Sequence, residues 1–130
     1  MKKLLFFILT LIFVACSSGD GDNSSNTPNI NPDLVSTWFG TSTDYDGSLI
    51  EETLVLNSDG TGSLTFLYQA EEDPIPETIL ISDWYTDNTT VYLIWYESPD
   101  EWGYALSDNN NVLEINFSDE TTVIYDRIFD

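Results

Sequence analysis

From residue 34 onward, apolar and polar residues alternate in short runs, and turn residues interrupt these runs at intervals of roughly ten. In one such run Leu64, Phe66 and Tyr68 fall on the same face. Side chains of a β-strand point alternately to its two faces, so a period of two predicts strands. No window repeats its apolar residues at the three-to-four spacing of a helix. The pattern therefore predicts an all-β domain.

Eight strands are expected from this alternation. They cover residues 34–43, 48–57, 61–69, 78–86, 89–96, 101–107, 111–117 and 120–128. Pairs such as Asp46-Gly47 and Asp59-Gly60 stand between them and tolerate the left-handed backbone of tight hairpins. Several strands carry apolar residues on both faces. We therefore expect an eight-stranded antiparallel up-and-down barrel, whose closure removes the edges of the sheet.

The N-terminus follows a different pattern. Two lysines precede an apolar run over residues 4–14, which ends just before Cys16, the only cysteine. The run is shorter than the roughly 18 to 20 residues that span a bilayer, so it predicts a signal peptide over residues 1–15. Residues 13–16 (Phe-Val-Ala-Cys) resemble a bacterial lipobox, which is cut before a lipid-modified cysteine. The resemblance implies acylation of Cys16, and the alternative is an ordinary signal peptide with a coincidental cysteine.

Small and polar residues dominate the segment that follows the signal. Gly, Ser, Asn, Asp and Pro fill it up to residue 33, so it cannot bury enough surface to fold. We expect an acylated cysteine with a disordered tether over residues 16–33, and a barrel domain over residues 34–130. Asp20 and Asp22 are similar to the surface-export signals of some Gram-negative lipoproteins. This similarity implies an outer-membrane lipoprotein exposed at the cell surface.

The charge of the chain is strongly negative. The chain has three Lys and Arg residues and 23 Asp and Glu residues, which gives a formal net charge of −20. Cleavage before Cys16 would remove both lysines and leave Arg127 as the only side-chain cation. Nucleic acid and anionic lipid surfaces would then be repelled, because both bind positive faces. A basic protein is the partner that such a charge attracts, and a solvated exterior is the alternative explanation.

Composition also excludes several kinds of chemistry. Histidine is absent and the single cysteine is assigned to lipid, so His-based triads, thiol catalysis and ordinary zinc or copper sites are excluded. Paired carboxylates remain for a glycosidase-like hydrolase. The adjacent carboxylates are Glu51-Glu52, Glu71-Glu72-Asp73 and Asp100-Glu101. Neighbours in a strand point to opposite faces and the others fall in expected loops, so a solvated surface explains them better.

Calcium is the one metal that the composition suits, because it binds oxygen ligands. Residues 44–47 (Asp-Tyr-Asp-Gly) match part of a calcium loop, but Thr53 stands where the bidentate acid is required. An Asp-Gly turn explains the segment better. We therefore expect no enzyme activity, no cofactor and no metal site.

Four short motifs in this order resemble the lipocalin-like family of small bacterial lipoproteins, over Leu34 to Phe129. They are Leu34-Val35-Ser36-Thr37-Trp38, residues 54–62 (LVLNSDGTG), Asp83-Trp84-Tyr85 and Tyr125-Asp126-Arg127. The resemblance implies an eight-stranded up-and-down barrel. The resemblance supports an inference about the fold more than one about the function.

The sequence predicts a structural role for Arg127 with Trp38 and a ligand-binding role for some of the other aromatic residues. If the last strand pairs with the first, the Arg127 guanidinium comes near Trp38, where a cation–π contact contributes roughly 0.5 to 2 kcal/mol to barrel closure. The alternative role for Arg127 is to bind a carboxylate of a ligand.

Among the aromatic residues of the middle strands most must form the core, but Trp95, Trp102 and Tyr104 flank residues 97–101. These three are the expected wall of a ligand cavity.

Three functions follow, in order of preference. The first is a non-enzymatic, lipid-anchored envelope protein that binds a small apolar ligand. The second is an acidic surface protein that captures a basic protein, as inhibitors of cationic lytic enzymes do. The third is a carboxylate hydrolase. The expected partners are thus the membrane, through the lipid on Cys16, and either a small apolar ligand or a basic protein, without nucleic acid.

Overall fold

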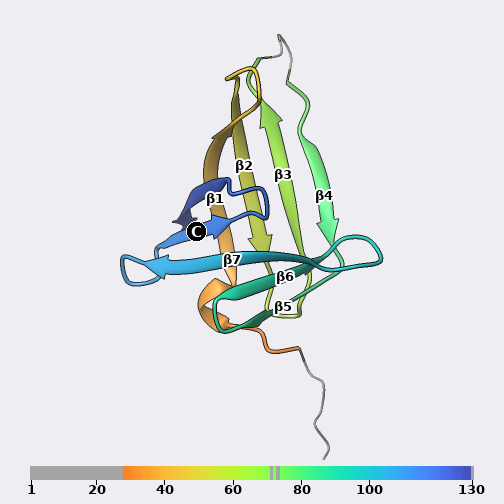
Figure 1. The fold of residues 1–130 in the computed structure, drawn as a ribbon, viewed down its shortest axis with the longest axis vertical. Helices are drawn as coiled ribbons and strands as arrows, with labels where there is room; N and C mark the ends of the chain where they lie inside the picture. Colours follow the sequence, from red (N-terminus) through yellow and green to blue (C-terminus); the bar gives the residue numbers. More distant parts are fainter. Residues whose placement is uncertain (1–27, 71, 73, 130) are drawn as a thin grey trace, which may run out of the picture.

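The computed structural model describes residues 28–70, 72 and 74–129, which form an antiparallel β-barrel that is nearly closed (Figure 1). The elements are η1 (Pro32–Leu34), a turn of 3₁₀-helix, followed by β1 (Ser36–Thr43), β2 (Leu49–Leu56), β3 (Gly62–Tyr68), β4 (Glu77–Ile81), β5 (Asp83–Asp87), β6 (Thr90–Ile94), β7 (Asp100–Ser107), β8 (Val112–Asn116) and β9 (Thr122–Ile128). The all-β prediction is confirmed. These residues contain no helix that is long and apolar enough to cross a membrane.

The expected number of eight strands is wrong, because the described residues form nine. The strand expected over residues 78–86 is two strands that meet at Ser82. Ile81 pairs with Gly62 of β3, whereas Asp83 pairs with Ile94 of β6. At the break, the backbone N–H and the hydroxyl of Ser82 both donate to the Ile94 carbonyl, at 2.7 and 2.8 Å. The chain thus changes its pairing partner within a segment that looks continuous in the sequence.

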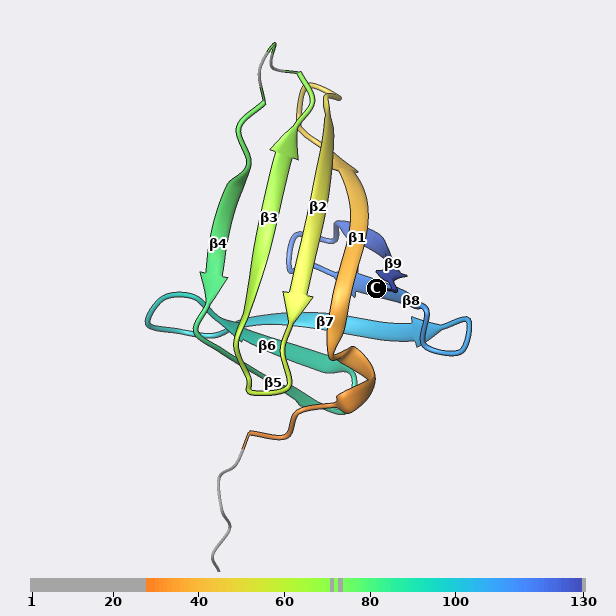
Figure 2. The same ribbon diagram turned by 180° about the vertical axis from the view of Figure 1, so that it is seen from behind.

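The strands follow one another round the sheet in the order β4-β3-β2-β1-β9-β8-β7-β6-β5. The expected pairing of the first and last strands is present, because β1 and β9 are neighbours. The two ends of this order, β4 and β5, are joined directly through Ser82. Strands β1 to β4 run side by side and cross the strands of the other half steeply (Figure 2). One bent segment therefore connects both ends of the sheet and leaves the barrel nearly closed.

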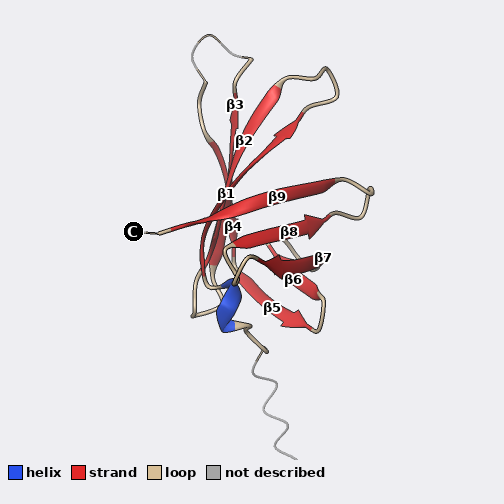
Figure 3. Ribbon diagram, turned by 90° about the vertical axis from the view of Figure 1, so that its left-hand side faces the viewer, coloured by secondary structure: helices blue, strands red, loops and turns tan. Residues whose placement is uncertain are grey.

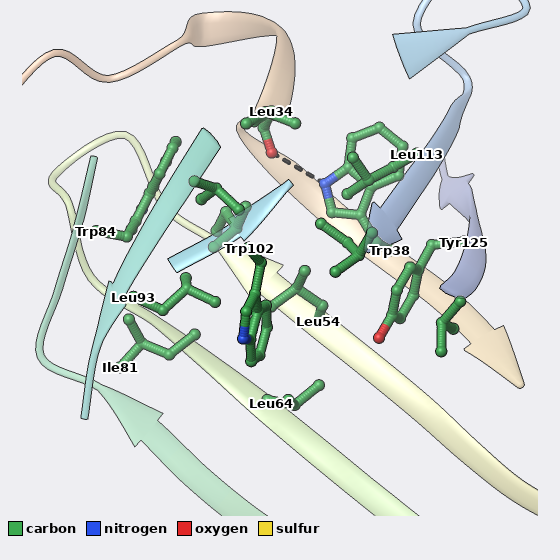
Figure 4. Packing of buried hydrophobic residues seen from close by; sticks show 14 residues of the cluster. Leu34, Trp38, Leu54, Leu64, Ile81, Trp84, Leu93, Trp102, Leu113 and Tyr125 are labelled. Carbon is green, nitrogen blue, oxygen red and sulfur yellow. Dashed lines mark hydrogen bonds between the residues drawn. The ribbon is translucent and has the colours of Figure 1, made fainter. Parts of the chain in front are cut away.

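One end of the barrel is filled by a tightly packed apolar cluster, which we call the closed end. Leu34, Trp38 and Trp84 are fully buried there. The indole N–H of Trp38 donates to the Leu34 carbonyl at 2.9 Å, drawn as the dashed line in Figure 4. The indole N–H of Trp84 donates to the carbonyl of Asn57, in the β2–β3 turn, at 3.0 Å. Both large rings are thus buried with their polar atoms satisfied by backbone.

Arg127 joins several segments at the closed end. It stands opposite Trp38 in the β1–β9 register, and its guanidinium carbon lies 4.5 Å from the centre of the Trp38 ring. The guanidinium donates to the carbonyls of Asp33, before β1, and Asn110, in the β7–β8 turn, at 2.5 and 2.9 Å. The only cation among the described residues is therefore bound to backbone and to an indole face.

Residues 28–33, from the C-terminal part of the expected tether, lie against the barrel at the closed end. The Asn29 carbonyl accepts hydrogen bonds from the backbone N–H and hydroxyl of Thr86 in β5, at 2.7 and 2.9 Å. Ile30 packs against the apolar cluster. This segment thus covers part of the outer edge of β5. The expected signal peptide and Cys16 lie outside the described residues.

Candidate functional site

The opposite end of the barrel, which we call the open end, contains a cavity. β1 pairs with β9 only from Thr37 to Gly40, whereas it continues beside β2 to Thr43. Beyond Gly40, β1 and β9 therefore separate. Figure 3 shows the β1–β2 hairpin rising away from the β8–β9 hairpin. Between them lies a cavity of about 400 Å³, lined from β1, β2, β3, β7, β9 and the β8–β9 turn.

The point of separation is fixed by the pair Gly40 and Tyr125. A Cβ atom on Gly40 would lie 2.8 Å from Cδ1 of Tyr125 and 2.9 Å from the Ile124 carbonyl oxygen. Both distances are shorter than real Cβ contacts, so only glycine lets the Tyr125 ring lie over β1 at this position. Tyr125 is fully buried, and its ring stands among the core residues drawn in Figure 4.

A buried carboxylate lies where Tyr125 points into the barrel. Glu52 of β2 is only 4 % exposed, and its side chain lines the cavity. One carboxylate oxygen accepts a hydrogen bond from the Tyr125 hydroxyl at 2.5 Å, and the other accepts one from the Ser42 hydroxyl. Burial, followed by the Glu52 charge and this hydrogen bond, raises the pKa of the Tyr125 phenol far above its ordinary range. Tyr125 therefore keeps its proton and is a fixed hydrogen-bond donor to Glu52.

Within the described part of the chain, Glu52 has no cationic partner. Arg127 is the only Lys or Arg there, and its guanidinium is bound to Trp38, Asp33 and Asn110 at the closed end. Burying a carboxylate without a counter-charge is costly, and two hydrogen bonds offset only part of that cost. In its carboxylate form, Glu52 therefore has no counter-charge from the described residues in the interior of the open end.

Aromatic rings form much of the remaining wall. Phe66, Tyr68, Trp102 and Phe117 line the cavity. The rings of Trp102 and Phe117 meet edge to face, with centroids 4.5 Å apart at 65°. Trp102 is 7 % exposed, so most of its surface belongs to the core and a small part faces the cavity. The wall thus offers apolar aromatic surface in the same cavity as a carboxylate.

The rim of the cavity is acidic as well. Asp119, in the β8–β9 turn, lines the cavity, and hydrogen bonds from the backbone and hydroxyl of Thr121 lower the pKa of its carboxyl. Burial, then the charges of Glu77, Asp44 and Glu52, raises the pKa of the Tyr68 phenol. The pKa of the Tyr68 phenol is therefore raised both by the carboxylates Glu77 and Asp44 and by the buried Glu52.

The residues expected to wall a cavity lie in two places. Trp95 and Trp102 pack together, with ring centroids 5.1 Å apart, but only Trp102 lines the cavity at the open end. The hydroxyl of Tyr104 accepts a hydrogen bond from the side-chain amide of Asn31 at 3.1 Å, in a second hollow of about 280 Å³ beside β5. None of residues 97–101 lines either hollow.

Sequence reasoning missed the polar side chains of this site. Glu51-Glu52 was assigned to solvated surface, yet Glu52 is buried. The signal was available, since Glu52 lies two and four residues before the core residues Leu54 and Leu56 and so falls on the inward face. No residue pattern marks Tyr125 as its partner, because the two strands meet only through the fold.

Among the described residues, no group of three or more His, Cys, Asp or Glu side chains could hold a metal ion. No protein-family model matches the chain, and no curated protein or solved structure is significantly similar to it. The site itself therefore defines the class of protein: a nearly closed antiparallel barrel with an acidic, aromatic-lined cavity at one end.

Proposed function

We propose that this chain is a non-enzymatic, ligand-binding barrel related to the lipocalin-like lipoproteins, and that its ligand occupies the cavity at the open end. The observation that carries the proposal is a cavity of about 400 Å³ that runs from the rim to the buried Glu52. Its size lies in the range of roughly 300 to 1,000 Å³ that is typical of small-molecule sites. Small barrels hold one small ligand in this manner.

The proposed role is binding rather than catalysis. The sequence contains no histidine, and its one cysteine is assigned to lipid. The carboxylate in the cavity accepts hydrogen bonds from Tyr125 and Ser42. A carboxylate held by two donors suits recognition, because further lone pairs remain available to a donor on the ligand.

Ligand entry can be tested by filling the cavity from its rim. Ile50 lines the cavity, whereas its neighbour Leu49 is 45 % exposed and does not. Prodan, a neutral environment-sensitive dye, should bind the parent protein with increased fluorescence. Ile50→Trp should weaken this binding at least about tenfold, and Leu49→Trp, the matched control, should leave it unchanged. Failure of the parent to bind the dye, or equal binding by both variants, would contradict the proposal.

We also propose that the protein is anchored in the bacterial outer membrane through acyl chains on Cys16. The support is the apolar run that ends just before this cysteine. Two acyl chains give stable anchoring, whereas one gives marginal binding. Cys16→Ser should therefore move the protein from the membrane to the soluble fraction. Retention of this variant on membranes after a high-salt wash would argue against the lipid anchor.

Capture of a basic protein remains the second candidate function. It is supported by the single cation, Arg127, among the described residues and by the carboxylates Asp44, Glu77 and Asp119 near the open end. Binding of a strongly basic protein should weaken sharply above physiological ionic strength, because surface charges are screened there. Binding of prodan should change little over the same salt range.

A further inference from the structure

The charge of Glu52 restricts which ligand the cavity accepts. A neutral ligand that closed the cavity would remove the remaining water from a carboxylate that has no counter-ion. An anionic ligand would in addition be repelled by Glu52 in the interior and by Asp119 at the rim. A cationic ligand instead supplies the charge that this end of the barrel lacks.

Glu52 retains the capacity to bind such a ligand. Each of its carboxylate oxygens accepts one hydrogen bond within the protein, from Tyr125 or from Ser42. A carboxylate offers about four lone-pair positions, so both oxygens can accept a further hydrogen bond. The two donors also fix the orientation of the carboxylate before any ligand arrives. An ammonium N–H that reaches it forms a charge-assisted hydrogen bond, the stronger kind.

The aromatic wall suits the rest of such a ligand. Phe66, Trp102 and Phe117 provide apolar surface in the same cavity as the carboxylate. Ring faces attract cations, and apolar groups lose their contact with water against them. A molecule with one positive group and a small apolar body therefore matches both parts of the cavity at once.

From these contacts we propose that the cavity binds small organic cations, in which an ammonium group contacts Glu52 and an apolar body packs against the aromatic wall. This inference rests on the proposed ligand-binding function and specifies the chemical class of its ligand. It adds a charge requirement to the small apolar ligand expected from the sequence, because the sequence pattern placed Glu52 on the solvated surface, whereas it is buried.

Three probes of nearly equal shape test the charge requirement. They are 2-phenylethylamine, which is a cation at pH 7, 2-phenylethanol, which is neutral, and phenylacetate, which is an anion. Isothermal titration calorimetry on the full-length chain should show the amine binding roughly ten- to a hundredfold more tightly than the alcohol, the range expected for a hydrogen bond to a charged group. Phenylacetate should bind most weakly.

Glu52→Gln removes the charge but keeps an acceptor for Tyr125 and a polar partner for Ser42. We expect it to reduce the preference for the amine to less than about threefold, because it weakens binding of the amine and removes the desolvation cost that 2-phenylethanol meets at the charged carboxylate. Glu51→Gln is the matched control, because it makes the same charge change on the neighbouring residue of β2, which does not line the cavity. That variant should keep the full preference.

The outcomes separate the two proposals. If the parent binds amine and alcohol equally, or if Glu52→Gln keeps the preference, the cavity is a ligand site without charge selection and the inference is wrong. If no probe binds at millimolar concentration, both the inference and the proposed binding function fail. If Glu52→Gln does not fold, the ranking of the three probes on the parent and on Glu51→Gln still decides the charge requirement.

Discussion

The two ends of this barrel are built from the same sheet but differ in how their buried polar groups are satisfied. At the closed end, the indole N–H groups of Trp38 and Trp84 donate to backbone carbonyls, and Leu34 fills the space between strands. At the open end, the buried Glu52 carboxylate accepts hydrogen bonds from the Ser42 and Tyr125 hydroxyls, and the described residues place no cation beside it. Apolar packing with backbone partners favours stability, whereas a buried charge lowers it. The comparison indicates that the closed end supports the fold, whereas the open end, where we propose that a ligand binds, holds a buried polar group at a cost in stability.

The largest expected effect comes from removing a tryptophan at each end. Trp38→Ala should lower the free energy of unfolding by about 3–5 kcal/mol, because a fully buried ring leaves a cavity that rigid neighbours cannot fill. Trp102→Ala should cost clearly less, since the ring borders an existing cavity. Urea unfolding measures both. Equal losses would show that the open end is packed core.

The next effect concerns the hydroxyl that holds Glu52. Tyr125→Phe leaves the carboxylate with Ser42 as its only described donor, and should lower the free energy of unfolding by about 1.5–3 kcal/mol, as expected for a hydrogen bond to a charged group. In a Glu52→Gln background the same change should cost only about 0.5–1.5 kcal/mol, because the bond is then neutral. Equal costs in both backgrounds would argue against a charged Glu52.

Two glycines test the point where β1 leaves β9. Gly40→Ala should lower the free energy of unfolding by about 1–3 kcal/mol, because its Cβ would overlap the Tyr125 ring and the Ile124 carbonyl. Gly103→Ala is the control, since the nearest atom to its Cβ would be the Asn116 Cβ at 3.5 Å, an ordinary contact. That change should be neutral or slightly stabilising. A neutral Gly40→Ala would show that the strands can separate elsewhere.

A smaller effect is expected from the cation–π contact between Arg127 and Trp38 at the closed end. Arg127→Ala and Trp38→Leu, made singly and together, should show a coupling of about 0.5–1.5 kcal/mol, because the guanidinium lies 4.5 Å from the indole centre. The hydrogen bonds of Arg127 to Asp33 and Asn110 cancel in this cycle. Additive losses in urea unfolding would exclude an energetic contact between the two side chains.

The smallest effect is a pH dependence from the hairpin turns. Asp59 accepts hydrogen bonds from the hydroxyl and then the backbone N–H of Thr61, which lower the pKa of its carboxyl in the folded protein. The ionised form therefore favours folding, and this contribution is lost as the pH falls below about 4. Asp59→Asn should lower stability slightly at pH 7 and reduce the loss of stability below about pH 4. An unchanged acid profile would contradict the role of this carboxylate.

Local features of the fold could be predicted from the sequence, whereas contacts between distant strands could not. Alternation located the strands to within a few residues, and the positive φ angles of Gly47 and Gly60 agree with the Asp-Gly turns. The division at Ser82 has a local signature that was overlooked. The buried residues Ile81 and Trp84 lie three positions apart, so the period of two changes phase between them.

The candidate site was less predictable because it depends on how two strands diverge. The distance over which β1 and β9 stay paired is set by the contact between Gly40 and Tyr125, which are 85 positions apart in the chain. Trp102 was expected to line a cavity from its place among the middle aromatics, and it borders the one at the open end. Glu52 could have been assigned to the interior because it alternates with Leu54 and Leu56, but its hydrogen-bond partners could not have been identified from the sequence.

The hydrogen bonds that Thr86 donates to the Asn29 carbonyl also determine at which end the N-terminal segment meets the barrel. They hold the N-terminal segment at the closed end, opposite the β1–β2 turn at the open end (Figures 1 and 2). If Cys16 is the anchor, the twelve residues between it and Asn29 reach at most about 45 Å. The chain would then approach the bilayer from the closed end and leave the mouth of the cavity, at the opposite end, free to receive ligands by diffusion through water.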